Sequence, residues 1–239
     1  RSAFNNEAGL RFLLESALFG TFSTDTIVAA ATRKTFSVEI KSDLATDSFR
    51  RCAGCVVDSL KLNVPSQGPV TADWSILGRA ASSSASELGS GYTALAGYTS
   101  MSGGLTGTSV SYNGSALTGV TNFSMDMANG LAAQYAIGSS APDHITVDNF
   151  KLTGSGSYYN RDTTIFDVFL SEVADDVILV LKSSDASPIK QTCTVTIPAT
   201  VFTASDLSPE GLTLADKFTF AARYGAGIGS KVQFVFSAA

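Results

Sequence analysis

Few residues in this sequence are of a type that could perform catalysis. The only histidine is His144, which follows Pro142 and Asp143 in a turn context. A hydrolytic triad needs a histidine beside a nucleophilic serine, and no nucleophile-elbow motif is present. Most zinc sites also use histidine. We therefore expect His144 to be a solvated turn residue, and the sequence predicts no catalytic residues.

Cys52 and Cys55 form a CxxC pair, and Cys193 is the one remaining cysteine. In thioredoxin-like proteins this motif opens a helix after a strand, which lowers the pKa of the thiol. Here the pair precedes a strand, and a zinc ribbon would need a second pair. We expect neither a redox centre nor a metal site, and the odd cysteine count favours a reducing compartment. The adjacent Arg50 and Arg51 are expected to form a solvated loop or a contact between subunits.

The remaining polar motifs also lack the spacing that chemistry requires. Asp43, Asp47 and the pair Asp175 and Asp176 are scattered, with no acid and base at a recognisable separation. The glycine-rich stretch at 225–229 is not followed by Lys-Ser or Lys-Thr, so it is not a phosphate-binding P-loop. No cofactor is predicted.

Composition narrows the class of protein. The chain has 239 residues, of which 15% are charged, a low share, and its net charge is −5. An acidic balance argues against tight phosphate binding but suits a surface that nucleic acid slides past. There is no apolar run of ~18 residues, so no transmembrane helix and no membrane partner are expected. We expect one domain over residues 1–239.

The elements that would position any site are mostly strands. A helix is predicted at 5–20, with a cap from Asn5 or Asn6 and a left-handed residue at Gly20. One hairpin is predicted from 56–64 with 70–79, and a second from 119–127 with 130–138, turning at Asn129–Gly130. Their similar alternation suggests a short internal duplication. The Ser/Gly-rich segment 81–118 is expected to be a flexible arm or loop insertion.

Further elements follow the second hairpin. The alternation predicts strands at 35–41, 145–158, 177–181, 193–197, 218–224 and 232–236, with Val147 and Leu152 buried. A helix is predicted at 162–173, capped by Asp162, with Ile165, Phe166, Phe169 and Leu170 on its apolar side. Prolines 188, 198 and 209 are placed between elements.

Each hairpin has one polar and one apolar side. The apolar positions are Leu60, Leu62, Val64, Val70, Trp74, Phe123, Met125, Met127 and Tyr135, and we expect them to pack against an outer layer. The polar positions are Ser59, Lys61, Asn63, Thr71, Asp73, Ser75, Asn122, Ser124, Asp126 and Gln134.

Several segments resemble the tail tube proteins of long-tailed, siphovirus-like bacteriophages. They are Thr35-Phe36-Ser37-Val38-Glu39, the run from Gly54 to Leu60, Gly68-Pro69-Val70, the strand from Phe123 to Gly130, the stretch from Val147 to Leu170, Thr196-Ile197-Pro198 and the helix from Leu13 to Leu18. The order and spacing of the segments carry the resemblance, which spans most of the chain. The arm at 81–118 departs from the family pattern.

The resemblance implies a mainly β (α+β) tail-tube fold, a β-sandwich or barrel with one or two short flanking helices. Two long hairpins per subunit would form a hexameric inner β-barrel, and the rings would stack into the tube of a virion tail, assembled in the host cytoplasm. The polar positions above would then face the lumen. Two Asp and one Lys among them make this set net negative, which would let DNA pass without binding.

The same resemblance implies the partners. They are further copies of the chain, the tape-measure protein and genome DNA in the lumen, and the tail terminator and distal tail proteins at the tube ends. Two alternatives remain open from the sequence. One is a tube-end adaptor or initiator protein, and the other is a β-rich adhesion or binding module.

Overall fold

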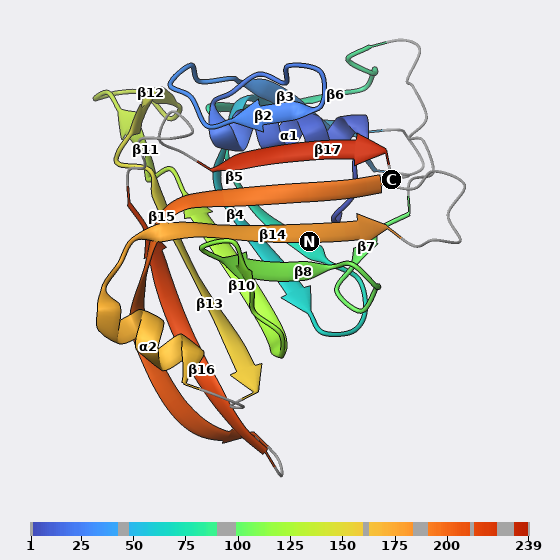
Figure 1. Ribbon diagram of the computed structural model, residues 1–239. Helices are drawn as coiled ribbons and strands as arrows, with labels where there is room; N and C mark the ends of the chain where they lie inside the picture. Colours follow the sequence, from blue (N-terminus) through green and yellow to red (C-terminus); the bar gives the residue numbers. More distant parts are fainter. Residues whose placement is uncertain are drawn as a thin grey trace.

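The computed structural model describes residues 2–42, 48–89, 99–159, 163–183, 191–210, 213–223 and 232–238. Asp43, Asp47, Asp162, Pro188 and the stretch 225–229 lie outside the described residues. The described part is mainly β, as the sequence predicts (Figure 1). Its elements are β1 (Ser2–Ala3), α1 (Ala8–Leu18), β2 (Thr26–Val28), β3 (Phe36–Ser42), β4 (Ser48–Pro65), β5 (Thr71–Leu77), β6 (Ala80–Ser84), β7 (Met101–Ser102), β8 (Ser109–Tyr112), β9 (Ser115–Ala116), β10 (Val120–Ala128), β11 (Leu131–Tyr135), β12 (Pro142–Val147), β13 (Lys151–Tyr159), α2 (Thr164–Ser171), β14 (Asp175–Ser183), β15 (Gln191–Glu210), β16 (Thr213–Ala222) and β17 (Gln233–Ala238).

Two long strands connect the parts of the main sheet. The C-terminal half of β4 pairs with β5 and β10, whereas its N-terminal half pairs with β3 and β6. The sheet continues from β10 through β13 and β16 to β15, which goes on to pair with β14 and β17. Because β4 and β15 each change partners along their length, one hydrogen-bonded network bends into two layers.

The expectation that prolines 198 and 209 separate elements is wrong, because both lie inside β15. Pro198 falls where β15 leaves β14 and begins to pair with β16, next to Ala199 with a left-handed φ of 48°. At such a change of partners the missing proline N–H removes no ladder bond. Pro209 lies near the end of the strand.

The two layers form a β-sandwich around one buried apolar cluster. In Figure 1, β14, β15 and β17 cross in front of β4, β5 and β10. Leu60, Leu62 and Phe123 come from the rear layer, and Leu179 and Phe234 come from the front layer; each is at most 1% exposed. Alternation of apolar and polar residues therefore fixes which side of each layer faces the core.

Helix α1 covers one end of the sandwich and packs against β4. The side-chain oxygen of Asn5 accepts a bond from the Glu7 N–H just before the helix begins. The left-handed residue after the helix is Phe19 (φ 51°), not Gly20 as expected. Gly20 is required for another reason, since a Cβ there would collide with the carbonyl oxygen of Val28 on β2.

The second predicted hairpin does not form. Strand β10 pairs with β4 and β13, while β11 turns away and pairs with β12 in a separate two-stranded sheet. Asn129 is the physical reason, because its buried amide donates to the carbonyl oxygens of Ala17 (2.8 Å) and Val57 (3.0 Å). These bonds tie Asn129 to α1 and β4, and Gly130, with φ 61°, redirects the chain.

The segment 81–118, expected to be a flexible arm or loop insertion, contributes short strands and core residues that the sequence pattern does not predict. It contains β7, β8, β9 and most of β6, and residues 90–98 lie outside the described part. Met101 is fully buried; it accepts a bond from the Val70 N–H and donates one to Phe4. Tyr112 and Leu117 also join the core. Apolar residues this sparse produce no period, so the sequence pattern could not reveal them.

Two further expectations need correction. The predicted strand at 145–158 is two strands, β12 and β13, and Val147 is 45% exposed although Leu152 is buried. Helix α2 is shorter than predicted, and of its expected apolar side only Ile165 is fully buried. Phe166 (45% exposed) and Leu170 (61% exposed) face outward.

Candidate functional site

The one histidine of the sequence lies on the surface of the protein. His144 is exposed on β12, where its Nδ1 lies 3.1 Å from Asp143 Oδ2. Within the described ranges, no group of three or more His, Cys, Asp or Glu side chains could hold a metal ion. Neither α1 nor α2, the helices of that part, is long and apolar enough to cross a bilayer.

The three thiols have different surroundings. Cys52 is exposed, whereas Cys55 and Cys193 are buried. The Cys55 thiol donates to the Cys52 carbonyl oxygen at 3.4 Å, across the bulge that Gly54 makes with φ 63°. Burial, with the adjacent Cys52, raises the pKa of Cys55, and complete burial raises that of Cys193 further. A raised pKa keeps a thiol protonated and unreactive, so neither buried cysteine resembles an activated nucleophile.

An organised polar surface covers the solvent-facing side of the sheet β5–β4–β10–β13–β16, with the end of β15. We call it the polar face. Cross-strand register builds it in rows: Asp73 lies opposite Lys61, which lies opposite Asp126, which lies opposite Thr153. Opposite charges thus alternate across three neighbouring strands, an arrangement that stabilises the pairing.

A second row of the polar face carries amides and hydroxyls. Asn63 donates to Asp73 Oδ2 at 3.3 Å, and Ser124 and Ser155 share a bond of 2.9 Å. Thr203 and Thr219 share another of 2.8 Å at the β15–β16 end. These side chains are short and bond to one another, so part of their hydrogen-bonding capacity is used within the surface.

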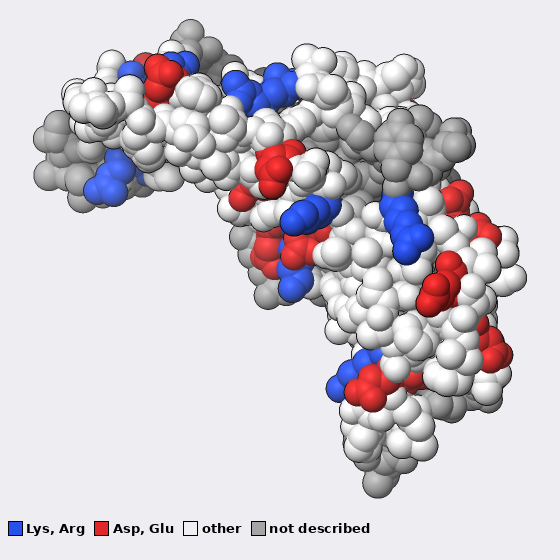
Figure 2. Space-filling model, turned by 90° about the vertical axis from the view of Figure 1, so that its left-hand side faces the viewer, with Lys and Arg blue, Asp and Glu red and all other residues white. Residues whose placement is uncertain are grey.

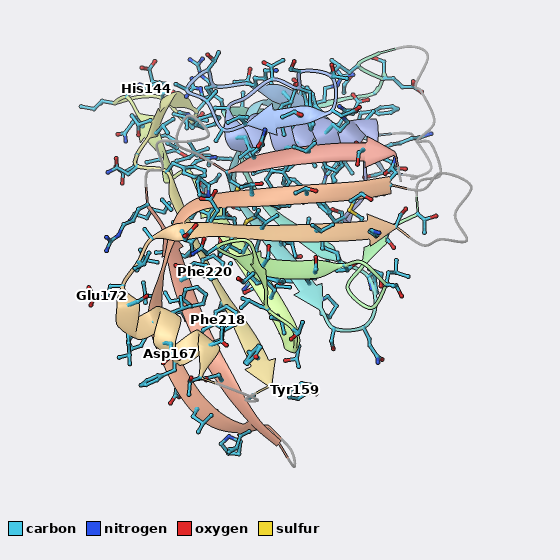
Figure 3. All side chains as sticks on the ribbon, viewed as in Figure 1. His144, Tyr159, Asp167, Glu172, Phe218 and Phe220 are labelled. Carbon is cyan, nitrogen blue, oxygen red and sulfur yellow. The ribbon has the colours of Figure 1, made fainter. Side chains whose placement is uncertain are left out.

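The reverse side of the same sheet is apolar and tightly packed. Leu60, Leu62 and Met125 have no exposed area. Phe218 and Phe220 lie over Gly156 and Gly154 of the neighbouring strand β13, where a Cβ would collide with their rings (Figure 3). The sheet therefore has one face committed to the core and one available for function.

All the residues expected to face a lumen, except Gln134, share the polar face. Gln134 lies on β11 and donates to Thr146 in the separate two-stranded sheet. Among the positions expected to pack inward, Trp74 is half-buried and donates to Ser2 Oγ, but Tyr135 is 64% exposed. Gln134 and Tyr135 are both misplaced because β11, which carries them, leaves the main sheet and pairs with β12.

The sequence pattern missed the contributions of β13, β15 and β16 to the polar face. These residues are Lys151, Thr153, Ser155, Ser157, Thr203, Asp206, Lys217 and Thr219. Their alternation was visible, but nothing local says which strands are neighbours. With them, the face carries Asp73, Asp126 and Asp206 against Lys61, Lys151 and Lys217. Among the side chains that the structure describes on this face, these three acidic and three basic residues balance, whereas the positions predicted from the sequence were net negative. Figure 2 shows acidic and basic side chains interspersed on the side of the molecule that it draws, turned by 90° from Figure 1.

Comparison with known proteins supplies one match. A protein family described as "Phage tail tube protein" matches residues 3–228, nearly the whole chain. No curated protein matches the sequence.

Proposed function

The chain belongs to the phage tail tube protein family, whose members are structural components of the virion tail rather than enzymes, and from this we propose that it forms six-membered rings that stack into the tail tube. Membership implies self-assembly into the tail and contact with other tail components. We further propose that genome DNA leaves through the lumen of this tube. The observation that carries the proposal is the one-sided sheet, polar on one face and buried on the other.

The polar face is our candidate for the lumen wall. Duplex DNA has one negative charge per ~1.7 Å, and a net basic wall would hold it through counterion release. Alternating Asp73, Lys61 and Asp126 give no net attraction to DNA. The paired hydroxyls of the second row bond to one another, which leaves fewer of their groups to bind a base or a phosphate. Charge balance, rather than the net negative charge inferred from the sequence, is the property that would let DNA pass without binding.

The edges of the same sheet support ring closure between copies. Beyond β4, strand β5 pairs only with the two residues of β1, and the β15 segment after Thr200 pairs only with β16, among the described strands. Long unpaired edges invite strand addition from another chain. Pairing of β5 from one copy with β15 from the next would extend the sheet into a closed barrel.

The remaining partners follow from the same proposal. The tape-measure protein would occupy the lumen before DNA, and terminator and distal tail proteins would close the tube ends after assembly in the host cytoplasm. We propose that the chain acts as one tail-tube unit, supported by the single apolar cluster that joins Phe4 to Phe236 and by the family match over residues 3–228.

Negative-stain electron microscopy of the purified protein over a range of concentrations tests the assembly. We expect hollow tubes with sixfold end views. Single rings that never stack would instead favour a tube-end adaptor or initiator. Monomers at every concentration, together with the absence of the protein from purified tails, would refute the proposal.

Charge reversal tests the lumen. Virions carrying Asp73→Lys and Asp126→Lys should eject DNA more slowly, and more so at low salt, since the change adds basic charge to every subunit of the wall. The matched control is Asp143→Lys with Asp148→Lys, the same charge change at exposed residues outside the polar face. An unchanged ejection rate in the first variant would remove the polar face as the lumen wall.

A further inference from the structure

Helix α2 leaves an apolar stripe facing away from the protein. Phe166 and Leu170 are four residues apart, on one side of the helix, and Val173 follows directly after its end. Their exposures are 45%, 61% and 53%. Ile165 on the opposite side is buried and anchors the helix to the core. Exposed apolar side chains that lie together, here on α2 and two residues beyond its end, are typical of a docking surface.

The surroundings of this stripe are acidic. Asp167 lies on α2 and Glu172 is the residue that caps its C-terminal end, and both are exposed. Asp175 and Asp176 follow at the start of β14. Residues 163–176 contain no lysine or arginine. A partner surface for the α2 stripe should therefore be apolar at its centre and basic at its edge.

The same chain carries a surface of that kind at its other end. A groove of about 710 Å³ opens on the small sheet β3–β4–β6. Val38, Ile40 and Ile76 give it an apolar floor, and Ile40 is 60% exposed. Register places Arg50 opposite Ile40 and Cys52 opposite Val38, so Arg50 lies beside the apolar floor. Arg51 also lines the groove and bonds to Glu39 at 2.6 Å.

We propose that the α2 stripe of one copy docks in the β3–β4–β6 groove of the next copy. Side chains four residues apart on one helix face are the usual anchors for a helix in an apolar groove. The acidic edge of the stripe meets Arg50 at the edge of the groove, which sets the orientation. The occupant is a second copy because both halves of the contact are present on every chain.

The contact is head-to-tail. In Figure 1, β3 and β6 lie at the top of the molecule and α2 near the bottom, so docking joins opposite ends of successive copies. A contact between two different surfaces leaves one of each free, so it continues from copy to copy unless the rotation between copies closes a ring. The inference rests on the proposed tube and assigns this contact to the stacking of one ring on the next.

Disulfide trapping tests the docking, because Cys52 is an exposed thiol already in the groove. The test protein carries Leu170→Cys together with Cys55→Ser, which prevents an intrachain bond between Cys52 and Cys55. Oxidation with diamide should give a ladder of linked chains on non-reducing gels, at least tenfold above controls. One control adds Cys52→Ser, and the other places the new thiol at Thr146→Cys, exposed but outside α2.

The outcomes separate this inference from the proposed function. A ladder that requires both position 170 and Cys52 supports the docking. Linked dimers that form without Cys52 mean that α2 pairs with α2, and this overturns it. Tubes without any ladder overturn the docking while the tube function stands. Wild-type protein that neither assembles nor enters tails refutes the function itself, and a ladder in that case would still report the docking.

Charge reversal gives a second measurement that needs no new thiol. Arg50→Glu should raise the concentration needed for stacking about tenfold, or ~1.4 kcal/mol, because acidic groups then face one another. Adding Asp167→Arg in the same chain should restore most of the loss. Rings should form in both variants. A double variant no better than the single one would mean that these two edges do not meet.

Discussion

Two glycines on β13 should be irreplaceable, because aromatic rings occupy the space where a side chain would lie. At Gly154 an added Cβ would come closer than 3.0 Å to Phe220 Cζ and also to the backbone oxygen of Ser124. At Gly156 it would meet Phe218 Cζ, with the backbone oxygen of Asn122 at 2.9 Å. Neither glycine has a left-handed φ, so a collision, not backbone strain, is the cause.

The loss of stability in each variant depends on how far the atoms that meet the added Cβ can shift. Overpacking a tight core costs about 1–3 kcal/mol, and a backbone atom yields less than a ring. We expect Gly154→Ala to cost about 3 kcal/mol and Gly156→Ala about 2 kcal/mol. For a chain of this length each kcal/mol lowers the unfolding midpoint by about 2–4 °C. Scanning calorimetry should therefore show losses of about 6–12 °C and about 4–8 °C.

A matched control and a rescue make this test sharp. Gly89 has open space around its Cβ position and no left-handed φ, so Gly89→Ala should change the midpoint by no more than ~2 °C. Phe218→Leu removes the ring that blocks a Cβ at Gly156. The double variant Gly156→Ala with Phe218→Leu should therefore lose less stability than the two single variants added together. A Gly154→Ala protein that melts within 1 °C of wild type would refute the packing argument.

Three other predictions concern single side chains. Burial alone would raise the pKa of Glu15, but the hydrogen bonds from Lys34 and from the backbone lower it below the ordinary value of 4.5. The ionised carboxylate therefore stabilises the fold above pH 4.5, and this stabilisation is lost as the pH falls through the lowered pKa. The difference in melting temperature between wild type and Glu15→Gln should accordingly disappear in acid. Asn129→Ala removes the donor of two hydrogen bonds, to the carbonyl oxygens of Ala17 and Val57, and should cost about 1–3 kcal/mol in urea unfolding. A cost below ~0.5 kcal/mol would contradict the role of this amide in joining α1 to β4. A thiol-specific disulfide reagent should modify Cys52 in the native protein and Cys193 only after unfolding, so rapid native modification of both would contradict the burial.

The alternation of apolar and polar residues was sufficient to predict an element wherever that element pairs with a segment close to it along the chain. The β4–β5 hairpin was predicted because alternation on both sides of Pro65–Pro69 leaves few ways to pair. Helix α1 was predicted because its apolar residues recur at helical spacing, and its observed bounds, Ala8–Leu18, lie within the predicted range. The polar positions of β4, β5 and β10 follow from the same alternation, since a strand with one buried side must present its other side to solvent.

The local sequence pattern gave the wrong prediction where a contact with a residue far away in the chain determines the pairing or burial of a segment. Asn129–Gly130 has the sequence of a hairpin turn, yet its amide bonds to Ala17 and Val57 instead, and β11 pairs elsewhere. Met101 lies in a Ser/Gly-rich stretch with no apolar period, and its burial depends on Phe4 and Val70. Each case is a long-range contact, which local propensity cannot encode.

The sequence by itself determined the class of the protein, the main β4–β5 hairpin with its two faces, helix α1 and the lack of a recognisable catalytic motif. These are consequences of residue type and period, which act within a few residues. Only the tertiary structure decided which strands lie side by side. That choice adds Lys151, Lys217 and Asp206 to the polar face, so that three basic and three acidic residues are present among its described side chains. The net charge of a sheet face is the sum over side chains from neighbouring strands, and strands become neighbours only when the chain folds.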